Sequence, residues 1–170
     1  MKNPLVVNAL ELLRRPGSLK DVACEVEPDV VELHDERLVP ESTVDVDLVC
    51  SSLSNGIVIE GKISARFHGE CRRCLASVTG RIDTPVRELY QETITDPDAF
   101  PIENDQIDLR PLVRETVLLE LPDAPLCSAD CRGLCPVCGV DRNATACSCS
   151  TEARDPRWSA LDALREQLPE

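Results

Sequence analysis

The amino-acid sequence predicts an α+β fold with three parts. These are an antiparallel β-sheet over about residues 19–90, helices flanking the sheet, and a zinc-knuckle segment toward the C-terminus. Apolar and polar residues alternate in residues 43–49, as in a half-buried strand. Ser54-Asn55-Gly56 then signals a hairpin turn into a return strand. Six of the ten cysteines cluster between Cys127 and Cys149.

The first half of the chain supplies most of the sheet. Asn3 is expected to cap a helix over residues 5–13, which Pro16-Gly17 ends. Strands are expected over residues 19–31 and 43–49, and on both sides of the connection that holds Cys71 and Cys74. With this many strands the sheet could curl toward a barrel.

The second half is expected to contain a loop and two helices. Residues 91–106 form an acidic loop, and Asp108 then caps a helix that reaches about Glu120. Asp155-Pro156 opens a short C-terminal helix that carries Trp158. We therefore expect an α+β core in residues 1–125 and a cysteine-rich, metal-binding segment with its helix in residues 126–170.

The cysteine spacing predicts a structural zinc site. Cys135 and Cys138 lie two residues apart, with a proline between them and a glycine after them, as in a zinc knuckle. Zinc needs four ligands, and Cys147 and Cys149 are favoured as the second pair because residues 140–146 can fold back as a short hairpin. Cys127 and Cys131 are the alternative pair, and a two-metal cluster that shares all six thiolates also fits the spacing.

Cys71 and Cys74 form a weaker candidate for metal binding. A lone C-x-x-C pair between two strands can be half of a metal site, a redox dithiol or two small residues in a turn. The redox interpretation lacks the helix that lowers the pKa of the first thiol in thioredoxin-like sites.

The chain is expected to act in the cytoplasm. It has no apolar run long enough to span a membrane, and Glu11, Arg14 and Arg15 interrupt any signal peptide. Cytoplasmic cysteines stay reduced, which favours metal ligation over disulfides. The spacing of Cys131, Cys135 and Cys138 also matches an iron–sulfur motif of radical enzymes, but the chain is too short for their barrel.

Charge is distributed unevenly. The chain has 31 acidic and 18 basic residues, and its net charge of −13 argues against a general nucleic-acid coat protein. Residues 62–81 nevertheless contain one acid, Glu70, among five basic residues that form a candidate RNA-binding patch: Lys62, Arg66, Arg72, Arg73 and Arg81.

The opposite charge follows directly along the chain. Residues 88–109 contain seven acids and no basic residue, which suits a basic protein partner. The candidate partner-binding residues are Glu88, Glu92, Asp96, Asp98, Glu103 and Asp105. Solvated faces that only keep the protein soluble are the alternative for both runs.

Several separated motifs together resemble the YceD family. They are Asp108-Leu109-Arg110-Pro111-Leu112-Val113-Arg114-Glu115 leading to Leu119-Glu120-Leu121-Pro122, Cys71-Arg72-Arg73-Cys74-Leu75, the GLCPxCG run at residues 133–139, and Asp155-Pro156-Arg157-Trp158. Arg14-Arg15-Pro16-Gly17 is similar to the actinobacterial branch of this family.

The resemblance implies a role in 23S ribosomal RNA accumulation and large-subunit assembly. The family's gene often lies beside that of a small large-subunit ribosomal protein, which makes a basic ribosomal protein, ribosomal RNA, or both the expected partners. Some members lack the C-terminal cysteines, so the resemblance implies that the metal site is a structural staple. No catalytic residues carry over.

The residues themselves also favour a non-enzyme. His34 and His68 are the only histidines, and no nucleophile–base arrangement has a useful spacing. A four-thiolate zinc site leaves no open position for water. The alternative function is a zinc-dependent redox sensor or regulatory protein, which would need a reactive ligand thiolate.

Overall fold

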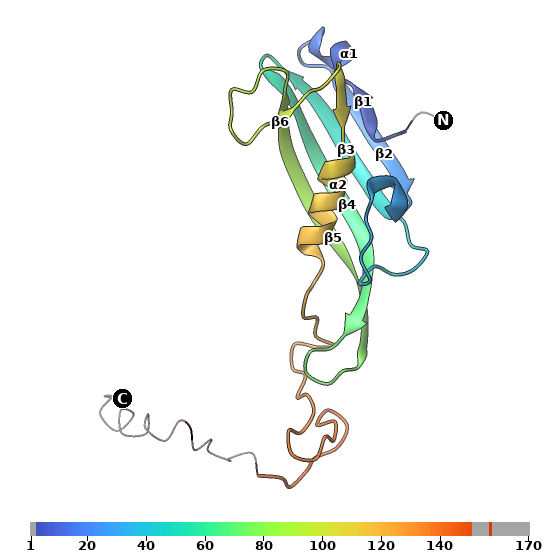
Figure 1. Ribbon diagram of the computed structural model, residues 1–170, viewed down its shortest axis with the longest axis vertical. Helices are drawn as coiled ribbons and strands as arrows, with labels where there is room; N and C mark the ends of the chain where they lie inside the picture. The colour runs from blue at the N-terminus through green and yellow to red at the C-terminus, as the bar shows by residue number, and fades with distance from the viewer. Residues whose placement is uncertain (1–2, 151–156, 158–170) are drawn as a thin grey trace, which may run out of the picture.

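A five-stranded sheet forms the body of the computed structural model, which describes residues 3–150 and residue 157 (Figure 1). The strands lie in chain order, with antiparallel neighbours from β2 to β5 and β6 parallel to β5. They are β2 (Leu19–Val26), β3 (Val44–Leu53), β4 (Gly56–Glu70), β5 (Ser77–Gln91) and β6 (Phe100–Pro101). The α+β class is thus confirmed.

The sheet is open and does not close into a barrel. Its edge strands β2 and β6 do not pair with each other. β6 has only two residues, and Pro101 has no N–H to donate to a further strand. The expected curl toward a barrel is therefore wrong.

A two-stranded sheet near the N-terminus changes the expected first helix. β1 (Val6–Asn8) pairs antiparallel with β7 (Gln106–Asp108), and α1 (Ala9–Leu13) begins only after β1. The N-cap is Asn8, whose side chain accepts a hydrogen bond from Glu11 N at 3.2 Å. The expected cap at Asn3 is wrong, because pairing with a distant segment holds residues 6–8 extended.

Two further boundaries differ from the sequence expectation. The strand expected over residues 19–31 ends at Val26, and a 3₁₀ helix, η1 (Pro28–Val31), follows. Helix α2 (Arg110–Glu120) has Leu109, not Asp108, as its N-cap residue. The Asp108 carboxylate instead accepts a hydrogen bond from Arg110 N at 3.0 Å and pairs with the Arg110 guanidinium.

The main core lies between the sheet and the segments that cover one of its faces. Alternate residues of β3 and β4 point inward, including Val46, Leu48, Ile59 and Ile63, and Val113 and Val117 of α2 belong to the same cluster. The β4–β5 hairpin extends beyond α2, and the cysteine-rich segment lies at its tip (Figure 1). The expected C-terminal helix with Trp158 lies outside the described residues.

Candidate metal centre

The structure brings together the four cysteines favoured by their spacing. The Sγ atoms of Cys135, Cys138, Cys147 and Cys149 all lie within 4.8 Å of one another, and we call this group the knuckle set. A short hairpin encloses the first pair, in which Cys135 N donates to Val140 O at 2.8 Å, and a turn in which Thr145 N donates to Asp141 O at 2.9 Å then leads to the second pair. An isolated bridge between Leu134 and Asp141 closes this hairpin.

A second group of four cysteines forms at the tip of the β4–β5 hairpin. Cys71 and Cys74 lie between β4 and β5, Cys127 and Cys131 follow α2, and the four Sγ atoms lie within 4.8 Å of one another. We call this group the tip set. The sequence left Cys127 and Cys131 as the alternative pair for the knuckle, and Cys71 and Cys74 as a possible half of a metal site. The structure places eight cysteines in two sets of four rather than in one shared cluster of six.

The two sets contain knuckles of the same construction. The residue after the second cysteine has a positive φ in both, 61° at Leu75 and 73° at Gly139. In both, its N–H donates to the carbonyl oxygen of the first cysteine, at 2.9 Å to Cys71 and 2.8 Å to Cys135. A leucine in place of the usual glycine hid the first knuckle from the sequence analysis.

Backbone donors favour the thiolate form of one cysteine in each knuckle. The N–H of Cys127, followed by those of Arg73 and Cys74, lowers the pKa of Cys71 to about 6. The N–H groups of Cys138 and Val137 lower the pKa of Cys135 to about 6. Such donors stabilise a charged sulfur, as a metal ligand requires.

Another thiol in each set has its pKa shifted in the opposite direction. The hydrogen bond with Cys131, followed by that with Cys74, raises the pKa of Cys127 to about 12. The hydrogen bond with Cys138 raises the pKa of Cys149 to about 12. Four thiols this close cannot all ionise without a cation among them. Each set could therefore hold a metal ion with four sulfur ligands.

Contacts between backbone and side chains join the cysteine segment to the hairpin tip. Arg72 N donates to Pro125 O at 3.0 Å, and Leu134 N donates to Arg73 O at 2.9 Å. The Arg73 guanidinium donates to Cys131 O at 2.9 Å. Gly133, with a φ of 68°, packs so closely that an added Cβ would lie 2.8 Å from Arg73 O.

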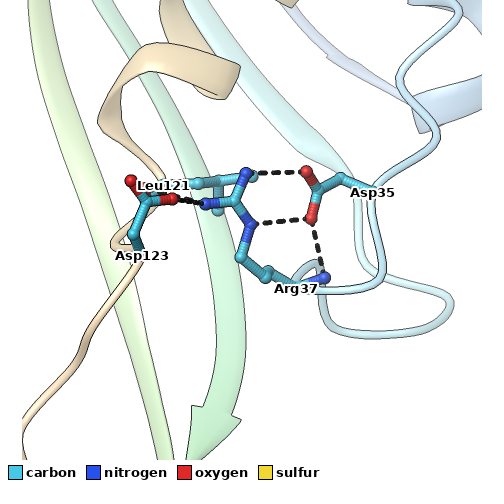
Figure 2. A network of polar contacts seen from close by, with 4 residues as sticks. All are labelled: Asp35, Arg37, Leu121 and Asp123. Carbon is cyan, nitrogen blue, oxygen red and sulfur yellow. Dashed lines mark hydrogen bonds and ion pairs between the residues drawn. The ribbon is translucent and has the colours of Figure 1, made fainter. Parts of the chain in front are cut away.

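Arg37 binds the segment that leads from α2 toward these cysteines (Figure 2). Arg37 holds the Asp35 carboxylate through Nε at 2.9 Å and Nη2 at 2.8 Å. Its Nη1 donates to Leu121 O at 3.2 Å and pairs with Asp123. The hydrogen bond from Arg37 lowers the pKa of Asp35. No local sequence pattern indicates the contact with Leu121 and Asp123, since these partners lie far from Arg37 in the chain.

The candidate RNA-binding residues are only partly available. Lys62 lies 3.4 Å from Asp83, and Arg81 pairs with Asp83 at 3.1 Å and Asp45 at 2.9 Å. Arg73 donates to backbone carbonyls of the cysteine segment. Arg66 and Arg72 are exposed. Acids on neighbouring strands therefore neutralise part of the patch.

The candidate acidic residues are accessible, with Glu88 half-buried on β5 and the other five exposed. Among the described residues, none of the six forms an ion pair. Buried Gln91 anchors the loop, because its Oε1 accepts hydrogen bonds from Thr95 N at 3.0 Å and Asp96 N at 3.2 Å. Its Nε2 donates to Asn55 O at 3.0 Å. The loop thus has a fixed base and a charged outer surface.

In the part of the chain that the structure describes, no helix combines the length and the apolar character needed to cross a membrane.

The chain is similar to several known proteins. An uncharacterized protein of Mycobacterium tuberculosis is 34% identical over 167 residues, which cover 94% of this chain and 80% of the relative. The uncharacterized protein YlbN of Bacillus subtilis is 29% identical over 119 residues, 67% of this chain and 69% of the relative.

A plant protein shares a shorter region. The chloroplastic large ribosomal RNA subunit accumulation protein YCED homolog 1 of Arabidopsis thaliana is 36% identical over 69 residues, 41% of this chain and 22% of the relative. No solved structure matches. The family model described as large ribosomal RNA subunit accumulation protein YceD matches residues 59–165, and because this is more than half of the chain, the protein belongs to the YceD family.

Proposed function

We propose that this protein is a non-enzymatic factor for large ribosomal subunit assembly and 23S ribosomal RNA accumulation, acting in the cytoplasm. Its membership of a family described by large ribosomal RNA subunit accumulation carries the proposal. The name of the Arabidopsis relative supports it. Its molecular role would be to hold a partner rather than to transform a substrate.

Zinc in the knuckle set is the proposed cofactor. Four thiolates in a tight group suit a d¹⁰ ion with no preference beyond tetrahedral coordination, and they leave no position for a reactive water. Zinc would fix the path of residues 135–149, a structural role. It would supply no chemistry to a reaction.

Metal analysis of the purified chain tests this assignment. The double variant Cys135→Ser/Cys138→Ser should lose the zinc of the knuckle set, whereas Cys24→Ser, a change on β2 away from both sets, should lose none. Full zinc content in the double variant would show that the knuckle set is not the site. Iron, with its visible thiolate absorption, would contradict the choice of metal.

The acidic loop is the proposed binding surface for a basic large-subunit ribosomal protein. Its exposed carboxylates have no ion-pair partners among the described residues, so their field is available to a partner. A groove of about 420 Å³ adjoins the loop, with Tyr90, Phe100 and Glu103 among its lining residues. The half-buried ring of Phe100 beside the exposed Glu103 carboxylate suits the long side chain of an arginine or lysine.

Direct contact with ribosomal RNA is the second part of the proposal. Arg66 and Arg72 are exposed on the hairpin and could meet phosphates. Asp83 works against this contact, because it pairs with both Lys62 and Arg81. We therefore expect protein binding to be stronger than RNA binding.

Titration of matched variants against a basic ribosomal protein and against 23S fragments separates the two contacts. Serine at Glu92, Asp96, Asp98, Glu103 and Asp105 should abolish protein binding and its salt dependence. Arg66→Ala/Arg72→Ala should weaken RNA binding alone, and Asp83→Asn should strengthen it by releasing two cations. Normal protein binding by the serine variant would refute the acidic loop as the binding surface for the ribosomal protein.

A further inference from the structure

We propose that the tip set holds a second zinc ion, and that Asn143 couples it to the ion in the knuckle set. The inference rests on the proposed zinc of the knuckle set and adds a second site to it. It concerns Cys71, Cys74, Cys127 and Cys131, which the sequence spacing left in separate, weaker pairs.

The sulfur separations of the tip set match tetrahedral coordination. Cys71 Sγ lies 3.7 Å from Cys131 Sγ, and Cys74 Sγ lies 3.5 Å from Cys127 Sγ. Four sulfurs at about 2.3 Å from one zinc ion lie about 3.8 Å apart. None of the four cysteines forms a disulfide, so their sulfurs remain available to a metal.

Burial adds a reason for a cation at this position. Cys71 has an exposed fraction of 0% and Cys131 of 3%, with Leu126 and Leu134 packed beside them. A buried thiolate is unfavourable unless a positive charge accompanies it. Zinc supplies that charge to all four sulfurs together.

The small size of the surrounding core points the same way. Cys71, Cys74 and Cys131 of the tip set form a hydrophobic cluster separate from the sheet core, together with three partly buried residues, Val78, Leu126 and Leu134. So few apolar contacts do not normally hold two chain segments together, and in small domains of this kind metal binding supplies the missing free energy. The ion would join the β4–β5 hairpin to the chain that follows α2.

Asn143 connects this site to the knuckle set. It lies in the loop between Cys138 and Cys147, yet its Nδ2 donates to Cys131 Sγ of the tip set at 3.4 Å. Its Oδ1 accepts from Arg132 N at 2.7 Å, and Asp141 Oδ1 holds its Nδ2 at 2.8 Å. Asn143 is thus a positioning residue for a sulfur of the other set.

This connection implies reciprocal coupling between the ions. A metal in the knuckle set would hold in place the loop that carries Asn143. The Asn143 side chain would then stay beside Cys131 Sγ and strengthen metal binding by the tip set. By linkage, a metal in the tip set must stabilise the knuckle set by the same factor.

Counting the zinc ions bound by the purified 170-residue chain tests the second site. Wild type should hold two ions per chain, Cys71→Ser/Cys74→Ser one, Cys135→Ser/Cys138→Ser one, and Cys24→Ser two. One ion in wild type, retained by Cys71→Ser/Cys74→Ser, would overturn this inference and leave the proposed knuckle site intact. No zinc in wild type would overturn both proposals.

Cobalt titration of the wild-type protein tests the second site even where the cysteine variants fail to fold. Wild-type apoprotein should develop the visible bands of tetrahedral cobalt thiolate over two equivalents of Co²⁺. Saturation at one equivalent would contradict a second site without any substitution.

Zinc release to a chromogenic chelator tests the coupling. Asn143→Asp keeps the acceptor for Arg132 N and removes the donor to Cys131, so the variant should still hold two ions. It should release the tip-set ion about 10- to 100-fold faster, the usual effect of losing a partner of a ligand. Asn55→Asp, in the β3–β4 turn, should release both ions at the wild-type rate.

A variant cycle shows whether Asn143 carries the coupling. Cys135→Ser/Cys138→Ser should also accelerate release from the tip set, and adding Asn143→Asp to it should change that rate little further. Independent, multiplicative effects would show that Asn143 does not transmit the coupling.

Discussion

Leu75 is a strained residue in the first knuckle. Its φ of 61° is one that side chains with a Cβ disfavour, and its side chain is 60% exposed, so packing compensates little. In this conformation the Leu75 N–H donates a hydrogen bond to Cys71 O at 2.9 Å, which closes the turn around the first thiolate. The unfavourable conformational free energy of Leu75 thus falls at a position where the metal site needs this backbone geometry.

Glycine at this position should therefore improve metal binding. Leu75→Gly should stabilise the tip set by about 1 kcal/mol, which is about fivefold in zinc affinity. Leu75→Ala is the control, since alanine keeps the Cβ and should give no gain. Competition with a chelator of known affinity measures both, and an equal gain in the two variants would contradict the role of backbone strain.

Gly133 allows the cysteine segment to approach the hairpin. It combines a φ of 68° with an added Cβ that would meet Arg73 O at 2.8 Å, whereas Gly139, at 73°, has open space around it. Gly133→Ala should destabilise the tip set by about 1–3 kcal/mol, more than Gly139→Ala, which bears only the strain of its φ. Chelator competition compares the two variants, and equal losses would contradict the close approach.

Residue spacing explains which cysteine contacts could be predicted. The knuckle set lies within fifteen positions, 135–149, and its proline and glycine report the turn directly, so local rules pair its four members. The tip set joins Cys71 and Cys74 to residues more than fifty positions away. No local pattern reports that contact, and Leu75 removes the glycine that would mark its knuckle.

At the scale of elements, α2 and the β4–β5 hairpin must be aligned for the tip set to form. Arg37 contributes to this alignment through Leu121 and Asp123 at the end of α2 (Figure 2). Backbone hydrogen bonds fix the loop of Arg37 to β4, where His68 N donates to Arg37 O at 2.8 Å and Val39 N donates to Arg66 O at 3.1 Å. One side chain therefore links β4 to the chain that leads into the cysteines.

Removing this link should loosen the connection without breaking the fold. Arg37→Ala should reduce stability by about 1–2 kcal/mol, since it deletes partly buried, charge-assisted hydrogen bonds. Amide exchange should accelerate around residues 121–126. Arg87→Ala, which removes an exposed pair with Glu60, is the matched control and should have little effect. Equal effects of the two variants would mean that Arg37 contributes only a surface charge pair.

Element boundaries show the same limit of local rules. Alternation correctly predicts β3 and β4, because both strands bury one face along most of their length. It fails at Val6–Asn8, where apolar residues that suit a helix pair with β7 instead. Asp108 is an acceptable N-cap by type, but it belongs to β7, and Leu109 is the residue that turns into α2.

At the scale of the whole molecule, the charge distribution differs from its linear pattern. The basic run in residues 62–81 lies beside acids of adjacent strands, so Asp45 and Asp83 reduce its field. The acidic loop meets no such partners among the described residues and keeps its field. A charge count along the sequence includes only neighbouring residues in the chain. In a sheet, the charges of adjacent strands also lie close and change the local field.

The molecule also divides its stability between two unequal cores. The large one contains the inner face of the sheet with α1 and α2, and none of the eight clustered cysteines belongs to it. The small one contains Cys71, Cys74 and Cys131 with a few apolar neighbours, and we expect its stability to depend on metal. The long β4–β5 hairpin belongs to both, since its inner residues pack in the sheet and its tip carries a knuckle.

Metal removal should therefore unfold one end of the protein and spare the other. A strong chelator should accelerate amide exchange in residues 70–77 and 127–149, because metal is expected to hold these segments together. Residues 44–53 and 56–66 should keep their protection, since more than twenty buried side chains of the sheet core do not touch the metal. Hydrogen exchange with and without chelator measures both regions, and restored zinc should restore protection at the tip. Loss of protection across the whole sheet would show that the two cores fold as one unit, whereas an unchanged tip would show that its hydrogen bonds suffice without metal.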